Sequence, residues 1–206
     1  LFFLILWEIM ALTAYCLVSF EHERPETRNA GVLFFIMSHL GTGCLILGFL
    51  LLFQAAGQVL GNYGPDSYSF ESFRALGNSL PPGPRNAAFL LFLVGFGVKA
   101  GIVPLHIWLP AAHPVAPSNA SALLSGVMIK TGIYGLTRVL FDFMGTPPNW
   151  WGVTLLTLGT LSAVLGVLYA LMEHDLKRLL AYSSIENIGI ILMGLGAALM
   201  FLHTQH

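Results

Sequence analysis

Two lysines and a glutamate interrupt apolar stretches of this sequence and are the residues best suited to chemistry. Glu8 lies in LFFLILWEIMALTAY, Lys99 in FLVGFGVKAGIV and Lys130 in LLSGVMIKTGIYG. An ionisable side chain at the centre of a bilayer costs between about 2.5 and 17 kcal/mol, and residues retained at that cost are usually functional and paired. We therefore expect these three residues to take part in proton translocation.

A buried lysine beside a carboxylate can act as a proton switch. Burial disfavours the charged form of an amine, whereas a neighbouring carboxylate favours it. A pair formed by Glu8 and Lys99 would hold a proton when closed and release it when open, for example to Lys130. Neutral lysine and histidine both accept protons, so a row of them can relay a proton through water.

His39 and Glu186 lie within or near apolar segments and are further candidates for the relay. Each candidate also has a structural alternative. His39 would form an interhelical hydrogen bond, and Glu186 would interact with the dipole of a nearby helix start. Glu8 and Lys99 would form a static salt bridge that fixes helix register, or Lys99 would bond to carbonyls freed by a proline.

The residues after Lys99 predict a broken membrane helix. Pro104 and Pro110, together with glycines at 95, 97 and 101, interrupt the apolar run GFGVKAGIVPLHIWLP. Non-helical backbone at membrane depth is tolerated only inside protein or beside a wet cavity, and discontinuous helices often mark the ion sites of transporters. We expect water to reach the break and hydrate Lys99.

The chain that must position these residues has the composition of a bilayer protein. It has 206 residues, of which 56% are hydrophobic and 9% are charged, with a mean hydropathy of +0.77. Soluble domains carry about 25% charged residues. Because a membrane-spanning helix needs about 20 apolar residues, the sequence predicts an all-α, polytopic transmembrane helical bundle in a single domain, residues 1–206. The expected helices are 1–20, 31–56, 86–110 (broken at Pro104), 118–143, 150–172 and 179–202.

The charged connections predict how the helices are oriented. The short connections EHERPETRN (21–29) and EHDLKR (173–178) carry Lys and Arg. Because Lys and Arg concentrate in short loops on the cytoplasmic side of a membrane, we expect both connections to face the cytoplasm. The long connection 57–85 is rich in Gly, Pro, Ser and Asn and is expected to lie outside the membrane. The chain begins at Leu1 inside an apolar run without a signal-peptide cleavage site, so we expect a fragment of a longer protein.

Several kinds of partner and cofactor are not predicted. A net charge of -1 argues against a nucleic-acid partner. Cys16 and Cys44 are isolated, so we expect neither a zinc site nor an iron–sulfur cluster. No motif for a flavin, a nickel centre, a quinone or a nicotinamide is present. We expect no cofactor, no metal and no catalytic centre in this chain.

Three stretches resemble a known family. VKAGIVPLHIWLPAAHPVAPSNASALLSGVMIKTGIYGLTR closely resembles a motif of the antiporter-like proton-translocating subunits of respiratory complex I, of membrane-bound hydrogenases such as formate hydrogenlyase, and of Mrp-type sodium/proton antiporters. HDLKRLLAYSSIENIGII and LWEIMALTAY resemble two further motifs. The resemblance implies an inverted-repeat fold, in which Glu8 is the buried glutamate, Lys99 its partner in the broken helix, and Lys130 the connecting lysine.

The resemblance also implies a function and a branch of the family. Lys130 is typical of the complex I and hydrogenase branches, and Glu186 in SSIENIG and His39 in MSHLG look most like the hydrogenase branch. The implied protein moves protons in the inner membrane of a bacterium or archaeon, together with other membrane subunits and a peripheral redox module. The alternatives are a subunit of an Mrp-type sodium/proton antiporter and a membrane scaffold.

Overall fold

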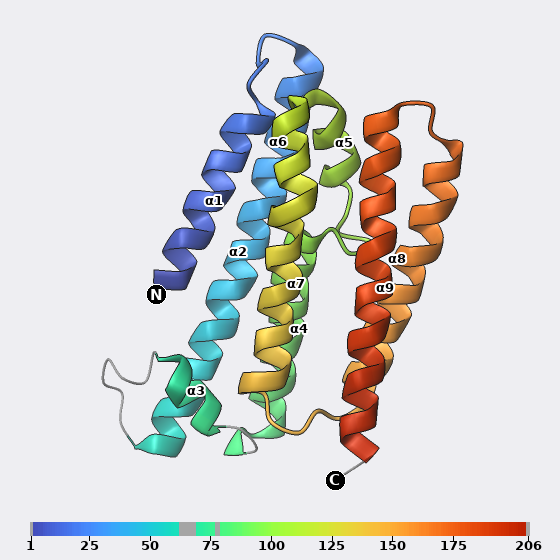
Figure 1. Ribbon diagram of the computed structural model, residues 1–206. Helices are drawn as coiled ribbons and strands as arrows, with labels where there is room; N and C mark the ends of the chain where they lie inside the picture. The colour runs from blue at the N-terminus through green and yellow to red at the C-terminus, as the bar shows by residue number, and fades with distance from the viewer. Residues whose placement is uncertain (1, 62–68, 77–78, 205–206) are drawn as a thin grey trace.

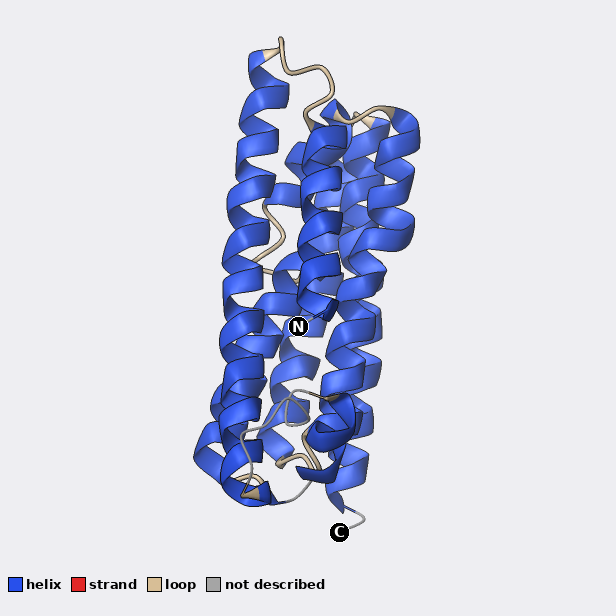
Figure 2. Cartoon of the chain, turned by 90° about the vertical axis from the view of Figure 1, so that its left-hand side faces the viewer, coloured by secondary structure: helices blue, strands red, loops and turns tan. Residues whose placement is uncertain are grey.

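The computed structural model describes residues 2–61, 69–76 and 79–204. Within these residues every regular element is helical, and the long helices run side by side along one axis (Figure 2). In Figure 1 the hairpin of α8 and α9 stands beside the group formed by α1, α2, α4 and α7. The expected all-α membrane bundle with a discontinuous helix is confirmed.

Three helices of the described part are long and apolar enough to cross a membrane. They are α2 (Pro25–Leu60), α8 (Asn149–Met172) and α9 (Leu176–Thr204). The other expected spans are divided differently. They comprise α1 (Phe2–Val18), the pair α4 (Pro82–Ala100) and α5 (Trp108–Val115), and a continuous helical run of α6 (Ser118–Leu123), a π-helical turn (Leu124–Met128), α7 (Ile129–Arg138) and a second π-helical turn (Val139–Phe143).

Two connections differ from the sequence expectation. Helix α2 begins at Pro25, so PETRN forms its first turns where a loop was expected. Proline suits this position because its fixed φ is already helical and its missing N–H needs no partner there. A short helix, α3 (Phe70–Leu76), lies within the expected long connection, of which residues 62–68 and 77–78 fall outside the described part.

Hydroxyl side chains on the outer face of α8 bond to their own helix. Thr154, Thr157 and Thr160 donate to the carbonyls of Trp150, Val153 and Leu156, at 2.8, 2.7 and 2.8 Å. Thr157 and Thr160 are exposed and Thr154 is half-buried. These internal bonds satisfy polar groups that lipid cannot.

Glycines allow α8 and α9 to approach backbone to backbone. A Cβ added at Gly159 would lie 2.7 Å from the carbonyl oxygen of Gly189. Neither position has room for a side chain while the helices keep this distance. Small residues at the interface are the usual means of close helix packing in membranes, where apolar surface alone gives no preference for protein over lipid.

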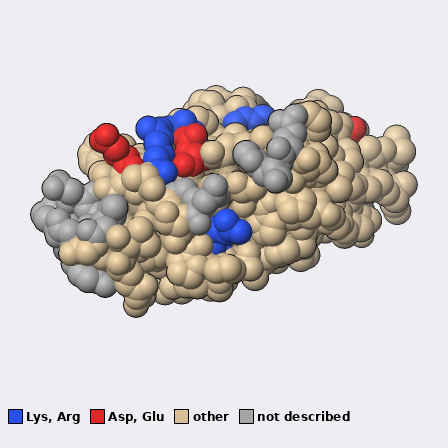
Figure 3. Space-filling view, turned by 90° about the horizontal axis from the view of Figure 1, so that it is seen from below, with Lys and Arg blue, Asp and Glu red and all other residues tan. Residues whose placement is uncertain are grey.

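Charged side chains lie at both ends of the bundle. The α1–α2 and α8–α9 connections lie at the same end (Figure 1), as alternating helices predict. The opposite end, near α3, is seen in Figure 3, where acidic and basic side chains gather on part of a largely uncharged face. There Asp142 forms ion pairs with Arg138 at 2.6 Å and with Arg74 of α3 at 3.6 Å.

Candidate functional site: a buried lysine at a helix break

Helix α4 is ended by a glycine, Gly101, which precedes both prolines in the chain. Helix α4 ends at Ala100 because Gly101 adopts a left-handed conformation (φ 76°), and its N–H donates to the carbonyl of Gly97 at 2.9 Å. This is the usual glycine C-cap. Pro104 lies in the connection that follows. Pro110 is the third residue of α5, where its missing N–H removes no intrahelical bond, so Pro110 does not cause the break.

Two hydrogen bonds fix the connection between α4 and α5, which lies about midway along the bundle (Figure 1). The indole N–H of Trp108 donates to the Val98 carbonyl at 2.7 Å. The Val103 N–H donates to Ser162 Oγ of α8 at 3.1 Å. The break is therefore a defined structure that ties α4, α5 and α8 together.

Lys99 lies in the last turn of α4 and is 2% exposed. Its Nζ forms no hydrogen bond with a described residue. The nitrogen lies over two aromatic rings, 5.6 Å from the ring centroid of Trp7 and 5.4 Å from that of Phe34. The expected alternative, in which Lys99 bonds to carbonyls freed at the break, is therefore not the arrangement in this structure.

Glu8 pairs with a histidine. Its Oε2 lies 3.3 Å from Nε2 of His39, and its Oε1 is buried without a hydrogen-bond partner among the described residues. The described ion pairs join Glu8 to His39 and not to Lys99, whose ammonium meets the Glu8 helix at Trp7, the residue before Glu8. The structure thus brings Glu8, His39 and Lys99 into one group.

The geometry of His39 implies a proton between the two side chains. Its Nδ1 lies 3.0 Å from the carbonyl of Phe35. Because a carbonyl only accepts, Nδ1 must carry a hydrogen, and Nε2 then carries another only when the imidazole is charged. A hydrogen bond between Nε2 and Glu8 therefore needs one shared proton, held either by the imidazole or by the carboxyl group.

Lys130 and Glu186 are not part of this group. Lys130 is exposed on α7, two residues after a π-helical turn, and Glu186 is half-buried in α9. Neither forms an ion pair with a described residue. Helix α7 nevertheless meets α4 beside Lys99, because a Cβ added at Gly132 would lie 2.9 Å from the backbone nitrogen of Ala100. Glu186 is ten residues into α9, so the expected interaction with a helix start does not apply.

Two histidines near the break were not considered from the sequence. His113 is 1% exposed and its Nδ1 lies 2.7 Å from Ser121 Oγ, while its Nε2 is buried without a described partner. Nδ1 of His106 is likewise buried without one. Buried polar atoms of this kind are usually satisfied by ordered water. The signal was available, since PLHIWLPAAHP places both histidines around the break.

Aromatic side chains close the bundle on the side of Lys99 toward α3. Phe96, one turn before Lys99, packs against Trp7 with centroids 5.5 Å apart and stacks on Phe92 at 5.9 Å. Phe92 in turn packs against Phe49 at 4.9 Å. The rings of Phe96, Phe92 and Phe49 offer no hydrogen-bonding path to Lys99 from this side.

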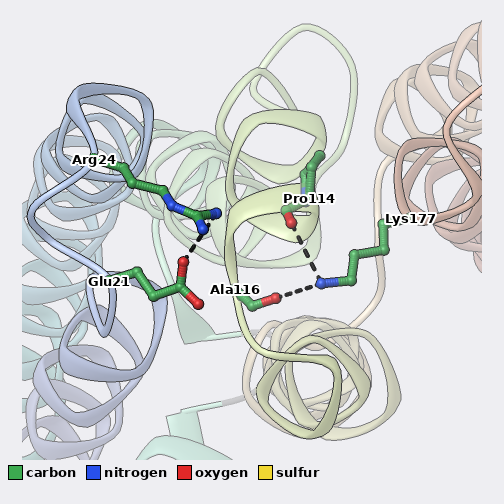
Figure 4. A network of polar contacts seen from close by, with 5 residues as sticks. All are labelled: Glu21, Arg24, Pro114, Ala116 and Lys177. Atoms are coloured by element: carbon green, nitrogen blue, oxygen red, sulfur yellow. Dashed lines mark hydrogen bonds and ion pairs between the residues drawn. The ribbon is translucent and has the colours of Figure 1, made fainter.

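A polar cavity of about 1010 Å³ opens at the other end of the bundle. Its charged lining residues come from the α1–α2 connection, the start of α2, the α8–α9 connection and the start of α9: Glu21, Arg24, Glu26, Asp175, Lys177 and Arg178. Figure 4 shows Lys177 reaching the end of α5, where Nζ donates to the carbonyls of Pro114 at 3.3 Å and Ala116 at 2.7 Å. Glu21 and Arg24 form a separate ion pair at 3.0 Å.

A broken helix with a buried lysine, beside a glutamate on a neighbouring helix, is the arrangement that the three sequence motifs predicted. The sequence model of the NADH:quinone oxidoreductase/Mrp antiporter transmembrane family matches residues 1–205. The chain belongs to this family. The predicted resemblance to antiporter-like membrane subunits is confirmed.

The similar sequences include hydrogenase components. Hydrogenase-4 component B of Escherichia coli K12 is 47% identical over 200 residues, and formate hydrogenlyase subunit 3 of the same bacterium is 44% identical over 196 residues. The alignments cover 96% and 95% of this antiporter-family chain. They cover 28% and 29% of the relatives, so the chain spans less than a third of their length.

Solved structures of respiratory complexes contain the same fold. A chain of the archaeal membrane-bound sulfane sulfur reductase superposes with a TM-score of 0.79 at 25% identity, covering 97% of this chain and 41% of that one. A chain of respiratory complex I from Thermus thermophilus superposes with a TM-score of 0.71 at 26% identity, covering 96% and 41%. The antiporter-family fold is therefore shared along almost the whole chain.

Proposed function

We propose that the protein to which this chain belongs is a proton-translocating membrane subunit of a redox-driven complex of the membrane-bound hydrogenase type. The observation that carries the proposal is the buried Lys99 at the helix break, beside the proton-sharing pair of Glu8 and His39. The hydrogenase branch is favoured by identity, 47% and 44% to hydrogenase-4 component B and formate hydrogenlyase subunit 3 against 32% and 36% to two NAD(P)H-quinone oxidoreductase chains.

Protons reach Lys99 in this proposal from the end that carries the polar cavity. The cavity borders the end of α5, and the buried polar atoms of His113 and His106 lie between that end and the break. Water bound to these atoms would connect the cavity with Lys99. The aromatic rings on the other side of Lys99 prevent the proton from crossing directly.

Lys99 then passes its proton toward Lys130 on the adjacent helix α7. The exchange is triggered by Glu8, which stabilises the ammonium when it turns toward Lys99 and makes the Lys99 proton easier to transfer when it pairs with His39. His39 therefore acts on the Glu8 side of the switch. Glu186 is proposed as a later polar position of the route, in α9.

The remaining assignments follow from the kind of complex. The redox chemistry would belong to a peripheral module in other subunits, with further membrane subunits as neighbours. The location would be the inner membrane of a bacterium or archaeon. The end that carries the α1–α2 and α8–α9 connections would face the cytoplasm, as the concentration of Lys and Arg indicates.

The test uses the full-length protein in its complex, reconstituted in vesicles. Replacing Lys99 or Glu8 with alanine is expected to abolish formation of a pH gradient while the complex stays assembled, because either change removes one half of the switch. Glu23→Ala, in the exposed α1–α2 connection, is the control. Unchanged pumping by an assembled Lys99→Ala complex would reject the proposal.

Two alternatives predict different outcomes. A sodium/proton antiporter would exchange the ions without any electron donor, so sodium-dependent transport in unenergised vesicles would favour it. A scaffold would keep its activity when Glu8 and Lys99 are both replaced with methionine, because apolar residues of similar volume can replace a buried charged pair.

A further inference from the structure

The Lys99 ammonium lies against aromatic faces contributed by two other helices. Nζ is 5.6 Å from the Trp7 centroid in α1 and 5.4 Å from the Phe34 centroid in α2, both within the roughly 6 Å over which a ring attracts a cation. Trp7 is 5% exposed and Phe34 is fully buried. The contacts are therefore shielded from bulk water, and cation–π attraction is strongest in such desolvated surroundings.

These rings offer what a carboxylate cannot. A buried cation needs compensation for the loss of water, and the nearby carboxylate of Glu8 is engaged with His39. The face of a ring attracts positive charge through its quadrupole but has no lone pair that takes up a proton. Trp7 and Phe34 can thus stabilise the ammonium without competing for its proton.

Both rings are held in place by other parts of the site. Phe34 packs edge-on against Trp108 with centroids 5.0 Å apart, and Trp108 is bonded to the Val98 carbonyl, one residue before Lys99. Trp7 packs edge-on against Phe96, one turn before Lys99. The helix break and α4 therefore set the position of both faces relative to the ammonium.

We propose that Trp7 and Phe34 are positioning residues that form an aromatic cage. While Glu8 is paired with His39, the cage stabilises the Lys99 ammonium until its proton passes to the next carrier. The cage is a property of the described helices. Its part in transport rests on the proposed function.

The decisive experiment changes the electrostatics of a ring while nearly preserving its shape. Phenylalanines carrying one, two and three ring fluorines are placed at position 34 of the full-length protein, with Lys99 present and in the Lys99→Met variant. Thermal unfolding is followed in detergent. Fluorine withdraws electron density from the ring face, so we expect the unfolding midpoint to fall stepwise with each fluorine when Lys99 is present, and this slope to vanish in Lys99→Met.

Phe89 provides the matched control. It is fully buried and stacks on Trp151 at 4.3 Å, and its described ring contacts do not include Lys99. Fluorination there should affect both backgrounds equally. A slope at position 34 that is the same with and without Lys99 would show that the ring only packs, and would overturn the cage.

Pumping measurements separate the cage from the proposed function. If the cage positions Lys99 for transport, Trp7→Leu should lower the pumping rate of the assembled complex and Trp7→Phe should restore it. A Lys99-dependent slope in a complex whose pumping ignores Lys99→Met would keep the cage and reject the transport role. Pumping that requires Lys99, in a protein that shows no Lys99-dependent slope, would reject the cage and keep the transport role of Lys99.

Discussion

Glu8 and His39 face each other across α1 and α2 with Oε2 and Nε2 3.3 Å apart, and the second ring nitrogen of His39 is bonded to the Phe35 carbonyl. This arrangement needs one proton between the two side chains. In the proposed switch, the Glu8 carboxylate thus has a partner other than Lys99. This partner would let the half-buried glutamate turn away from Lys99 without being left unpaired.

His39→Gln should slow proton translocation. The amide cannot hold the shared proton, so Glu8 loses a charge-assisted bond of about 1.5–3 kcal/mol. That loss corresponds to a roughly 10- to 150-fold lower rate if the bond forms during turnover. The measurement is the initial rate of pH-gradient formation in vesicles. His22→Gln, in the exposed α1–α2 connection, should pump normally, and equal rates for both variants would contradict the prediction.

Lys177→Met should loosen the end of α5. The change removes both hydrogen bonds to the Pro114 and Ala116 carbonyls. A hydrogen bond to a charged group contributes about 1.5–3 kcal/mol, and this range is an upper limit here because Lys177 is only half-buried. Hydrogen exchange of the α5 amides should become faster, while exchange in the middle of α8 should not change. Arg178→Met, next to it and exposed, serves as the control. If the α5 amides stay protected from hydrogen exchange in Lys177→Met, Lys177 does not hold the end of α5 and the prediction is wrong.

Ser162→Ala should destabilise the break. Ser162 accepts the Val103 N–H, and its loss leaves a buried donor unsatisfied, at a cost of about 1–3 kcal/mol. Thr160→Ala removes a hydroxyl from the exposed face of the same helix and should cost much less. Thermal unfolding of the full-length protein compares the two. Equal midpoints would mean that the bond contributes nothing to stability.

Gly159→Ala should weaken the α8–α9 hairpin. The new Cβ would lie 2.7 Å from the Gly189 carbonyl oxygen, so the helices must separate, at a cost of about 1–3 kcal/mol. Gly194→Ala, in α9, meets nothing within 4 Å and should stabilise the helix by about 0.5–1 kcal/mol. Opposite shifts in unfolding midpoint are expected, and a loss of stability in Gly194→Ala would count against the packing argument.

The sequence predicted the elements better than the contacts between them. Apolar runs of membrane length indicate helices wherever they occur, and the glycines and prolines after Lys99 predicted the break. The residue that ends α4 could not be chosen from sequence, because Gly101 and Pro104 both suit a helix end and only the backbone conformation decides between them.

The partners of the charged residues required the three-dimensional structure. Glu8 was expected to pair with Lys99, since opposite charges attract, but the crossing of α1 and α2 places His39 nearer to it. Trp7 and Phe34 were missed for another reason. An aromatic residue in an apolar run has the same sequence pattern whether it faces lipid, packs in the core or lies against a cation.

The bare backbone of Gly132 against the last turn of α4 has a mechanical consequence. With no side chain between them, neither helix can shift without pushing the other, because no rotamer change is available to absorb the motion. The two lysine-bearing segments are therefore in direct backbone contact at this point. Helix α5, by contrast, is joined to α4 by the connection 101–107 and is held from α9 by the Lys177 amine.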